Sequence, residues 1–385
     1  MTKDQSPMAP DGARPLTQNP ALFIDSCRAD IAEAKNAIAK LKTLAAPLRL
    51  EEALSIYDEA VGALGDAAAR ASVCRNAHPE VAMRDAAETC EQEIDAAMTE
   101  LSLDRGVYDA LASLDLAASD PETRHYVEKT LREMRRSGVD RDEPTRQKVR
   151  ALREELLKIG QEFGKNIKDD VRSLAVEAAA LAGLPDDFVS QHRPDESGKV
   201  TLTTDNTDYI PFITYASSGS AREALWRLYR SRAHPKNLDV LSRMLEKRYE
   251  LATLLGYPNW AAYATEDKMI GSAENAAEFI ARIAKASEAR GARDYAQLLS
   301  RKRKDAPAAE SVAAWDSAYY SERVAAEEYD FDSQSIRPYF EYRRVKKGVL
   351  DVTARLFGLT YRPVSVATWH PEVEVYDVLE GERLL

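Results

Sequence analysis

Apolar residues recur at intervals of three and four along most of this chain, and that spacing restricts the fold more than any other feature. Between Asn19 and Leu44 it gathers one set of apolar side chains: Ile24, Cys27, Ile31, Ala34, Ile38 and Leu41. A single apolar face is what a helix packed on one side requires. Asn19 followed by Pro20 predicts an N-cap and a proline at the first helical position. The pattern therefore predicts a mostly α-helical protein.

Similar periodicity predicts a series of further helices, at 50–73, 84–101, 120–137, 143–167, 221–231, 238–255, 272–301 and 345–357. Glycines at 138, 256 and 358 follow three of these helices, where glycine commonly ends a helix. The composition changes at 175–215, where Gly and Pro are frequent. Within it, apolar and polar residues alternate at 199–204 as in a short strand. We interpret that segment as a small α/β insertion or as the edge of a second domain.

Strict alternation of apolar and polar residues begins at Thr368 and predicts a half-buried strand. The apolar positions are Trp369, Pro371, Val373 and Val375. A turn is expected at 380–382, with the start of a second strand after it and nothing further for that strand to pair with. We interpret this ending as a truncation. Short strands are thus expected near 199–204 and 368–385.

The charge balance excludes some classes of partner. The net charge is −11 and the two signs are mixed along the chain, whereas a nucleic-acid-binding protein normally shows a basic face. No stretch approaches the roughly 18 consecutive apolar residues of a membrane span, and the first residues lack the apolar region of a signal peptide. Residues 1–18 have little to bury and are expected to form a disordered tail. Neither nucleic acid nor a membrane is expected as a partner.

The cysteines bear on the compartment. Cys27, Cys74 and Cys90 cannot all pair within one chain, and their spacing matches no zinc or redox motif. Cys27 falls on an apolar helical face, where a free thiol behaves as a small hydrophobic residue. These features predict a reducing compartment, most simply the cytoplasm.

Residue patterns that carry chemistry are few. A zinc hydrolase of the common type needs H-E-x-x-H on a helix, and none of the five histidines stands in that motif. His370, Glu372 and Glu374 would share one face of the expected strand. Successive same-face side chains are about 7 Å apart, whereas one ion needs its ligands about 2 Å away. A strand facing solvent or a cleft explains this triplet better than a metal site. No nucleophile elbow or Gly-rich phosphate loop occurs.

A series of short segments in a fixed order carries a family signal. They are 75–79 (RNAHP), 84–88 (RDAAE), 161–166 (QEFGKN), 183–188 (GLPDDF), 252–257 (ATLLGY), 315–320 (WDSAYY), 337–340 (RPYF), 356–359 (LFGL) and 369–370 (WH). In this order the chain resembles the thimet oligopeptidase, neurolysin and oligopeptidase A family of zinc metallopeptidases. The resemblance runs from about residue 20 to the last residue, and it is to the amino-terminal part of that family only.

The resemblance implies two mostly helical lobes flanking a deep, narrow channel that admits short unstructured peptides. On this basis 19–125 form the amino-terminal helical region of lobe one, 126–215 belong to lobe two, and 216–385 form the remainder of lobe one. Zinc in the family is bound by the H-E-x-x-H histidines and a downstream Glu, all expected beyond Leu385. We therefore name no catalytic and no metal-binding residue and expect this chain to bind no zinc. His370, Glu372 and Tyr376 are the candidates for lining the cleft.

Three interpretations remain open. The chain is the amino-terminal portion of a zinc-dependent oligopeptidase, inactive alone; or a non-catalytic helical module that binds peptides or a partner; or a gene relic that does not fold productively. The ending favours the first, because an unpaired edge strand is an aggregation risk. The intact helical periodicity argues against the relic. Expected partners are short peptides and the missing carboxy-terminal half.

Overall fold

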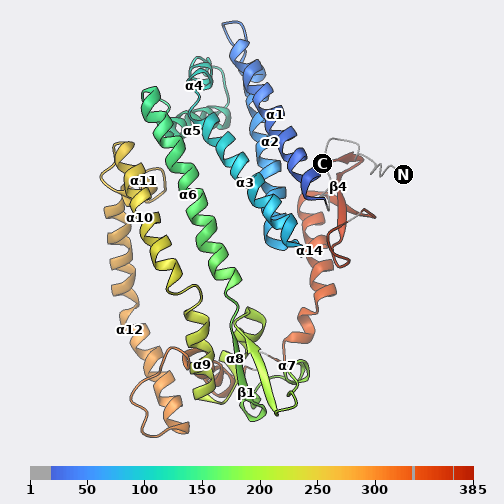
Figure 1. The fold of residues 1–385 in the computed structure, drawn as a ribbon, viewed down its shortest axis with the longest axis vertical. Helices are drawn as coiled ribbons and strands as arrows, with labels where there is room; N and C mark the ends of the chain where they lie inside the picture. The colour runs from blue at the N-terminus through green and yellow to red at the C-terminus, as the bar shows by residue number, and fades with distance from the viewer. Residues whose placement is uncertain (1–18, 332–333, 367) are drawn as a thin grey trace. The chain divides into compact units, whose positions relative to one another are not determined.

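The computed structural model describes residues 19–331, 334–366 and 368–385, and most of them are helical (Figure 1). The helices are α1 Pro20–Thr43, α2 Leu50–Ala77, α3 Val81–Ser102, α4 Arg105–Ala112, α5 Pro121–Ser137, α6 Glu143–Asp169, α7 Asp186–Gln191, α8 Asn206–Tyr215, α9 Gly219–Arg230, α10 Lys236–Leu254, α11 Trp260–Thr265, α12 Ala273–Asp305, α13 Ser317–Glu328 and α14 Tyr342–Phe357. The strands are β1 Ser173–Glu177, β2 Lys199–Thr203, β3 Leu359–Val364, β4 Val375–Glu380 and β5 Arg383–Leu384. A mostly α fold with a few short strands is confirmed. No helix in the described ranges combines the length and apolar character that a membrane crossing requires.

The chain divides into two compact units, which we describe separately. The first combines the chain up to Lys158 with Lys247–Trp260 and Leu350–Leu385. The second combines Ile159–Glu246 with Ala261–Val349. The assignment of residue ranges to the lobes of an oligopeptidase stays a prediction.

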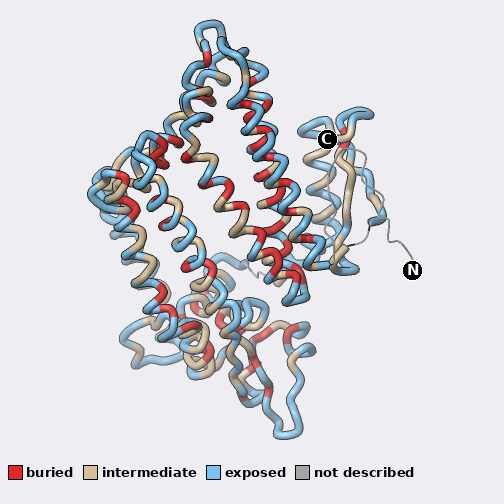
Figure 2. Tube along the Cα trace, turned by 45° about the horizontal axis from the view of Figure 1, so that its top comes forward, coloured by how far each residue is buried: buried red, intermediate tan, exposed pale blue. Residues whose placement is uncertain are grey.

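The core of the first unit is built by α1, α2 and α3, which lie side by side (Figure 1). α1 begins where predicted, because the Asn19 side-chain oxygen accepts hydrogen bonds from the N–H groups of Ala21 and Leu22, at 2.9 and 3.2 Å. Its inner face is buried at Phe23, Cys27, Ala34, Ala37 and Leu41. Figure 2 shows such buried positions along all three helices, as expected for helices that each pack one apolar stripe against their neighbours.

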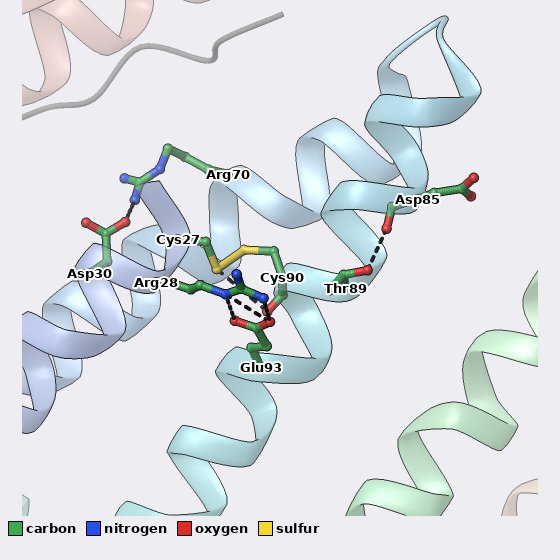
Figure 3. The surroundings of a disulfide bond; sticks show 8 residues. All are labelled: Cys27, Arg28, Asp30, Arg70, Asp85, Thr89, Cys90 and Glu93. Atoms are coloured by element: carbon green, nitrogen blue, oxygen red, sulfur yellow. Dashed lines mark hydrogen bonds and ion pairs between the residues drawn. A yellow bond between two sulfur atoms is a disulfide. The ribbon is translucent and has the colours of Figure 1, made fainter. Parts of the chain in front are cut away.

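A disulfide joins Cys27 on α1 to Cys90 on α3 (Figure 3). The prediction of a free thiol at Cys27 is therefore wrong. Three cysteines allow one pair, and Cys74 is left as a buried free thiol. The paired residues lie 63 positions apart, so only the packing of α1 on α3 brings them together. The expectation of a reducing compartment loses its support, because it depended on unpaired cysteines.

The second unit contains an antiparallel pair of strands, β1 and β2, in contact with α8 and α9. Alternate strand residues and the adjoining helices form one apolar cluster, which includes Val176, Val200, Leu202, Phe212 and Leu225. The strand predicted at 199–204 is confirmed as β2. β1 was missed because its sequence, SLAVE, is only five residues long and follows a long helix directly.

The strand predicted from Thr368 onward is wrong at its start. β4 begins at Val375, and the preceding residues form a turn in which the Val373 N–H donates to the His370 carbonyl at 3.0 Å. Pro371 lies in this turn and has no N–H to give to a strand ladder. β4 pairs antiparallel with β3 on one side and with β5 on the other. The expectation that the last strand has no partner is therefore also wrong.

Candidate functional site

The three candidates for cleft lining do not share one strand face. His370 and Glu372 are exposed in the turn before β4, where His370 Nδ1 accepts a hydrogen bond from the Glu372 N–H at 3.3 Å. Tyr376 is half-buried within β4, and its hydroxyl donates to the Glu374 carboxylate. The segment thus presents two exposed polar side chains on a turn and a third on a strand. Their role in a cleft stays a prediction.

The same segment does not fit a zinc site. Within the described ranges, no group of three or more His, Cys, Asp or Glu side chains lies close enough to hold a metal ion. One His370 ring nitrogen accepts from a backbone N–H, while the Glu374 carboxylate accepts from a tyrosine hydroxyl. Since these side chains engage different partners and share no common centre, we assign zinc no ligand in this segment.

The WDSAYY motif lies in a buried charge cluster of the second unit. We call it the Asp316 cluster and define it as Arg222, Lys302, Asp316 and Tyr319. Asp316 Oδ1 accepts from Arg222 Nη2 at 2.6 Å, and Asp316 Oδ2 accepts from Lys302 Nζ at 2.7 Å. Arg222 is 2% exposed and Asp316 is 4% exposed. One carboxylate therefore holds two cations, one from α9 and one from α12, at the start of α13.

The other donors of Arg222 are satisfied as well. Nη1 donates to the Ala216 carbonyl at 2.5 Å, and Nε donates to the Trp315 carbonyl at 3.3 Å. The guanidinium carbon lies 4.1 Å from the centroid of the Tyr319 ring, a cation–π contact. Each guanidinium nitrogen of Arg222 thus has an acceptor, so this buried charge is compensated within the fold. Through these contacts Asp316 and the Trp315 carbonyl connect α9 and α12 to the start of α13.

Arg222 escapes prediction from sequence, although one signal exists. On α9 it lies three residues before Leu225, which is fully buried. Residues three apart share a helix face, so a charged residue stands on the buried side. Charged side chains are almost never fully buried unless they are paired. That rule predicts a carboxylate partner, but sequence cannot say that the partner is 94 residues away.

A second charge cluster orders the entry to β1. Asp170 accepts hydrogen bonds from Arg172 Nη2 at 2.7 Å and from the Ala233 N–H at 2.6 Å. These bonds, that of Arg172 first, lower the pKa of Asp170 to about 2, because they favour the ionised carboxylate. Arg172 also donates to Ser231 Oγ at 2.9 Å. The cluster thereby ties the segment after α6 to the segment after α9.

One cavity in the first unit is a candidate ligand site by its size. It has a volume of about 170 Å³ and lies between α1, α2 and α3. Its floor is apolar, with Ile31, Ile38, Leu64, Ala97 and Leu101. Its rim charges pair with one another, Lys35 with Glu100 at 3.0 Å and Lys42 with Asp104 at 2.7 Å. Because a ligand site needs polar groups to fix orientation, and these are already paired, we assign the cavity no ligand.

The described residues thus form a mostly helical chain in which Asp316 of the WDSAYY motif contacts Arg222 and Lys302. Comparison with known proteins shows that this chain is similar to peptidases over most of its length. Residues 212–384 match peptidase family M3. The chain is 25% identical to oligopeptidase A of Salmonella typhimurium, over 92% of this chain and 55% of that protein. It is 27% identical to the organellar oligopeptidase A of Arabidopsis thaliana, over 78% of this chain and 41% of that protein.

A third relative extends over nearly the whole chain. Mitochondrial intermediate peptidase 1 of Cryptococcus neoformans is 28% identical over 98% of this chain and 51% of that protein. The resemblance to the oligopeptidase family, inferred from ordered short segments, is confirmed by these comparisons. The chain spans about half the length of the curated relatives it matches.

Proposed function

We propose that this chain is the amino-terminal portion of a zinc-dependent oligopeptidase that hydrolyses peptide bonds in short peptides. One observation carries the proposal: the similarity extends over 92% of the chain but over only 55% of oligopeptidase A from Salmonella typhimurium. The residues for catalysis then belong to the half of the relatives that has no counterpart here. The absence of H-E-x-x-H from the sequence agrees with this division.

The missing half is the proposed partner of this chain, and α14 supports that part of the proposal. Val352 and Leu356, both in the first unit, lie four positions apart and share one face of the helix. They are 53% and 70% exposed. Exposed apolar surface of this kind marks an interaction site, and a polypeptide equivalent to the remaining half of the relatives would cover it.

Three finer points belong to the same proposal. His370, Glu372 and Tyr376 line the peptide channel, and the lobes divide at the ranges 19–125, 126–215 and 216–385. Zinc is held outside this chain, because the residues present do not fit it. The location is cytoplasmic, as the name of a probable cytosolic oligopeptidase A from Arabidopsis thaliana says of that relative. Another relative is named as chloroplastic or mitochondrial, so the compartment needs its own measurement.

The proposal is tested with an internally quenched short peptide. The chain alone, with zinc present, is expected to show no hydrolysis and to retain no zinc after dialysis against a weak chelator. A fusion of the chain to the part of Salmonella typhimurium oligopeptidase A that the match does not cover is expected to hydrolyse the peptide, and a chelator is expected to stop it. A folded, zinc-loaded fusion without hydrolysis would refute the proposal. Chelator-sensitive hydrolysis by the chain alone would refute the absence of a metal site, and His370 and Glu372 would be substituted first.

A further inference from the structure

The Cys27–Cys90 disulfide lies inside the core of the first unit, not on its surface. The two cysteines are 3% and 1% exposed. Apolar side chains from all three helices surround the bond, including Phe23, Ala67, Ala71, Met83 and Ile94. A bond in this position connects α1 directly to α3, the first and last helices of the bundle.

We propose that Cys27 and Cys90 form a reversible two-electron redox site whose oxidation fastens α1 to α3, with a low-molecular-weight disulfide as oxidant. A thiolate of the pair attacks the small disulfide and releases one small thiolate, which gives a mixed disulfide. The second cysteine then attacks the protein sulfur of this mixed disulfide, so that the Cys27–Cys90 bond forms and the second small thiolate leaves. The protein loses two protons and two electrons, and the small disulfide is reduced to two thiols. This inference does not depend on peptidase activity.

Cys74 shares the apolar cluster but is not part of the proposed site. It lies on α2, and its thiol donates a weak hydrogen bond to the Met83 carbonyl at 3.5 Å. Burial raises the pKa of the Cys74 thiol, because the charged thiolate is disfavoured away from water. The structure joins Cys27 to Cys90, so one of the three possible pairings is formed and Cys74 stays a thiol.

Access to the disulfide is controlled by the ion pairs beside it. Because both sulfur atoms are buried, a reductant reaches them only when α1 moves away from α3. Arg28, next to Cys27, donates to Glu93 through Nη2 at 2.7 Å and through Nε at 3.0 Å. Asp30 pairs with Arg70 on α2. Figure 3 shows both pairs on α1 near the bond. Loss of one such pair is expected to speed local opening and hence reduction.

Counting maleimide labels by intact mass tests the pairing. Protein equilibrated with glutathione disulfide, then unfolded and treated with N-ethylmaleimide, is expected to take one label, on Cys74. Prior reduction by dithiothreitol is expected to raise the count to three. The Cys74→Ser variant is expected to take no label when oxidised and two labels after reduction. Cys74→Ala replaces it if that variant does not fold. Three labels on oxidised protein, or peptide mapping that finds Cys74 in a disulfide, would overturn the proposal.

The rate of reduction by dithiothreitol in native buffer tests the control of access. Glu93→Gln is expected to be reduced two- to fivefold faster than the parent, the range expected from the loss of an exposed ion pair. Glu100→Gln is the matched control, since Glu100 also pairs across α1 and α3, with Lys35, and is expected to keep the parental rate. All three proteins should be reduced at one rate in concentrated urea. Equal acceleration by both substitutions, or reduction of the native parent at its urea rate, would contradict access by local opening.

Discussion

Replacement of Asp316 by alanine is expected to destabilise the second unit strongly. The substitution removes the carboxylate that both Arg222 and Lys302 contact, at 2.6 and 2.7 Å. The Lys302 side chain is 17% exposed and can turn toward water, whereas that of Arg222 is 2% exposed and cannot. Breaking a buried ion pair by removing one partner costs about 3–5 kcal/mol, because it leaves an uncompensated charge. We expect Asp316→Ala to lower the free energy of unfolding by about that amount.

Urea unfolding followed by tryptophan fluorescence measures this effect. Trp226 and Trp315 lie beside the Asp316 cluster, with ring centroids 5.7 Å apart, so they report on the second unit. A loss of about 3–5 kcal/mol is large against the roughly 5–15 kcal/mol that stabilises a typical domain. Asp239→Ala is the control, because Asp239 is exposed and pairs with an arginine one helical turn away. Such exposed pairs contribute about 0.3–0.5 kcal/mol.

A small effect would refute this reasoning. If Asp316→Ala cost less than about 1 kcal/mol, the two carbonyls and the Tyr319 ring would suffice to compensate Arg222, and the carboxylate would not be the central group. The double substitution Arg222→Met with Asp316→Leu separates the two explanations. It removes the buried charges together, so it is expected to recover much of the loss, as buried ion pairs replaced by apolar residues often do.

Three further predictions concern other parts of the chain. Reduction of the Cys27–Cys90 disulfide removes a link across 63 residues of the unfolded chain, and it is expected to lower the free energy of unfolding in urea by about 4 kcal/mol. Cys74→Ser should leave this difference between the oxidised and reduced forms unchanged. The pKa of Asp170 is about 2 in the folded chain and about 3.9 when unfolded, so its stabilisation is present above about pH 4 and is lost as the pH falls toward 2. Asp170→Asn should flatten that part of the plot of melting temperature against pH. Gly183→Ala would place a Cβ 2.5 Å from a backbone carbonyl oxygen at φ +95°, and it should cost more than about 2 kcal/mol in urea unfolding. Gly198→Ala, at φ +80° in open space, should cost about 1 kcal/mol.

The long helices were predictable from sequence because their determinants are local, whereas the shorter helices α4, α7, α8, α11 and α13 have no counterpart in the predicted series. The N-cap at Asn19, the repeat of apolar residues along α1, and the left-handed glycines after α5 and α10 are all fixed within a few residues. The strands were harder to predict. The alternation does not predict β3, and it predicts the start of β4 seven residues early, because alternation alone does not show where pairing begins. Pairing depends on which strand lies alongside, and that partner is a property of the fold.

The chemically important contacts were beyond sequence for the same reason. Cys27 meets Cys90 over 63 residues, and Arg222 meets Asp316 over 94. The sequence places Cys27 on an apolar helical face, but the packing of helices decides which residue it meets. The family resemblance identifies the WDSAYY motif but says nothing of its contacts. In the structure Asp316 of this motif pairs with Arg222 and Lys302. Motif residues therefore need a structural test before they are assigned to catalysis.

The buried charges of the Asp316 cluster have their partners within the chain, whereas apolar side chains of α14 remain exposed. The Asp316 cluster is complete, since every charge in it has a partner among the described residues. The apolar face of α14 is not fully packed, because Val352 and Leu356 remain more than half exposed. Complete burial of a Val or Leu side chain contributes about 1.5–3 kcal/mol. A polypeptide that covered this face would gain several kcal/mol from these side chains. Under the proposed function, burial of Val352 and Leu356 by the partner would favour association, so substitution of these two residues is the first test of that contact.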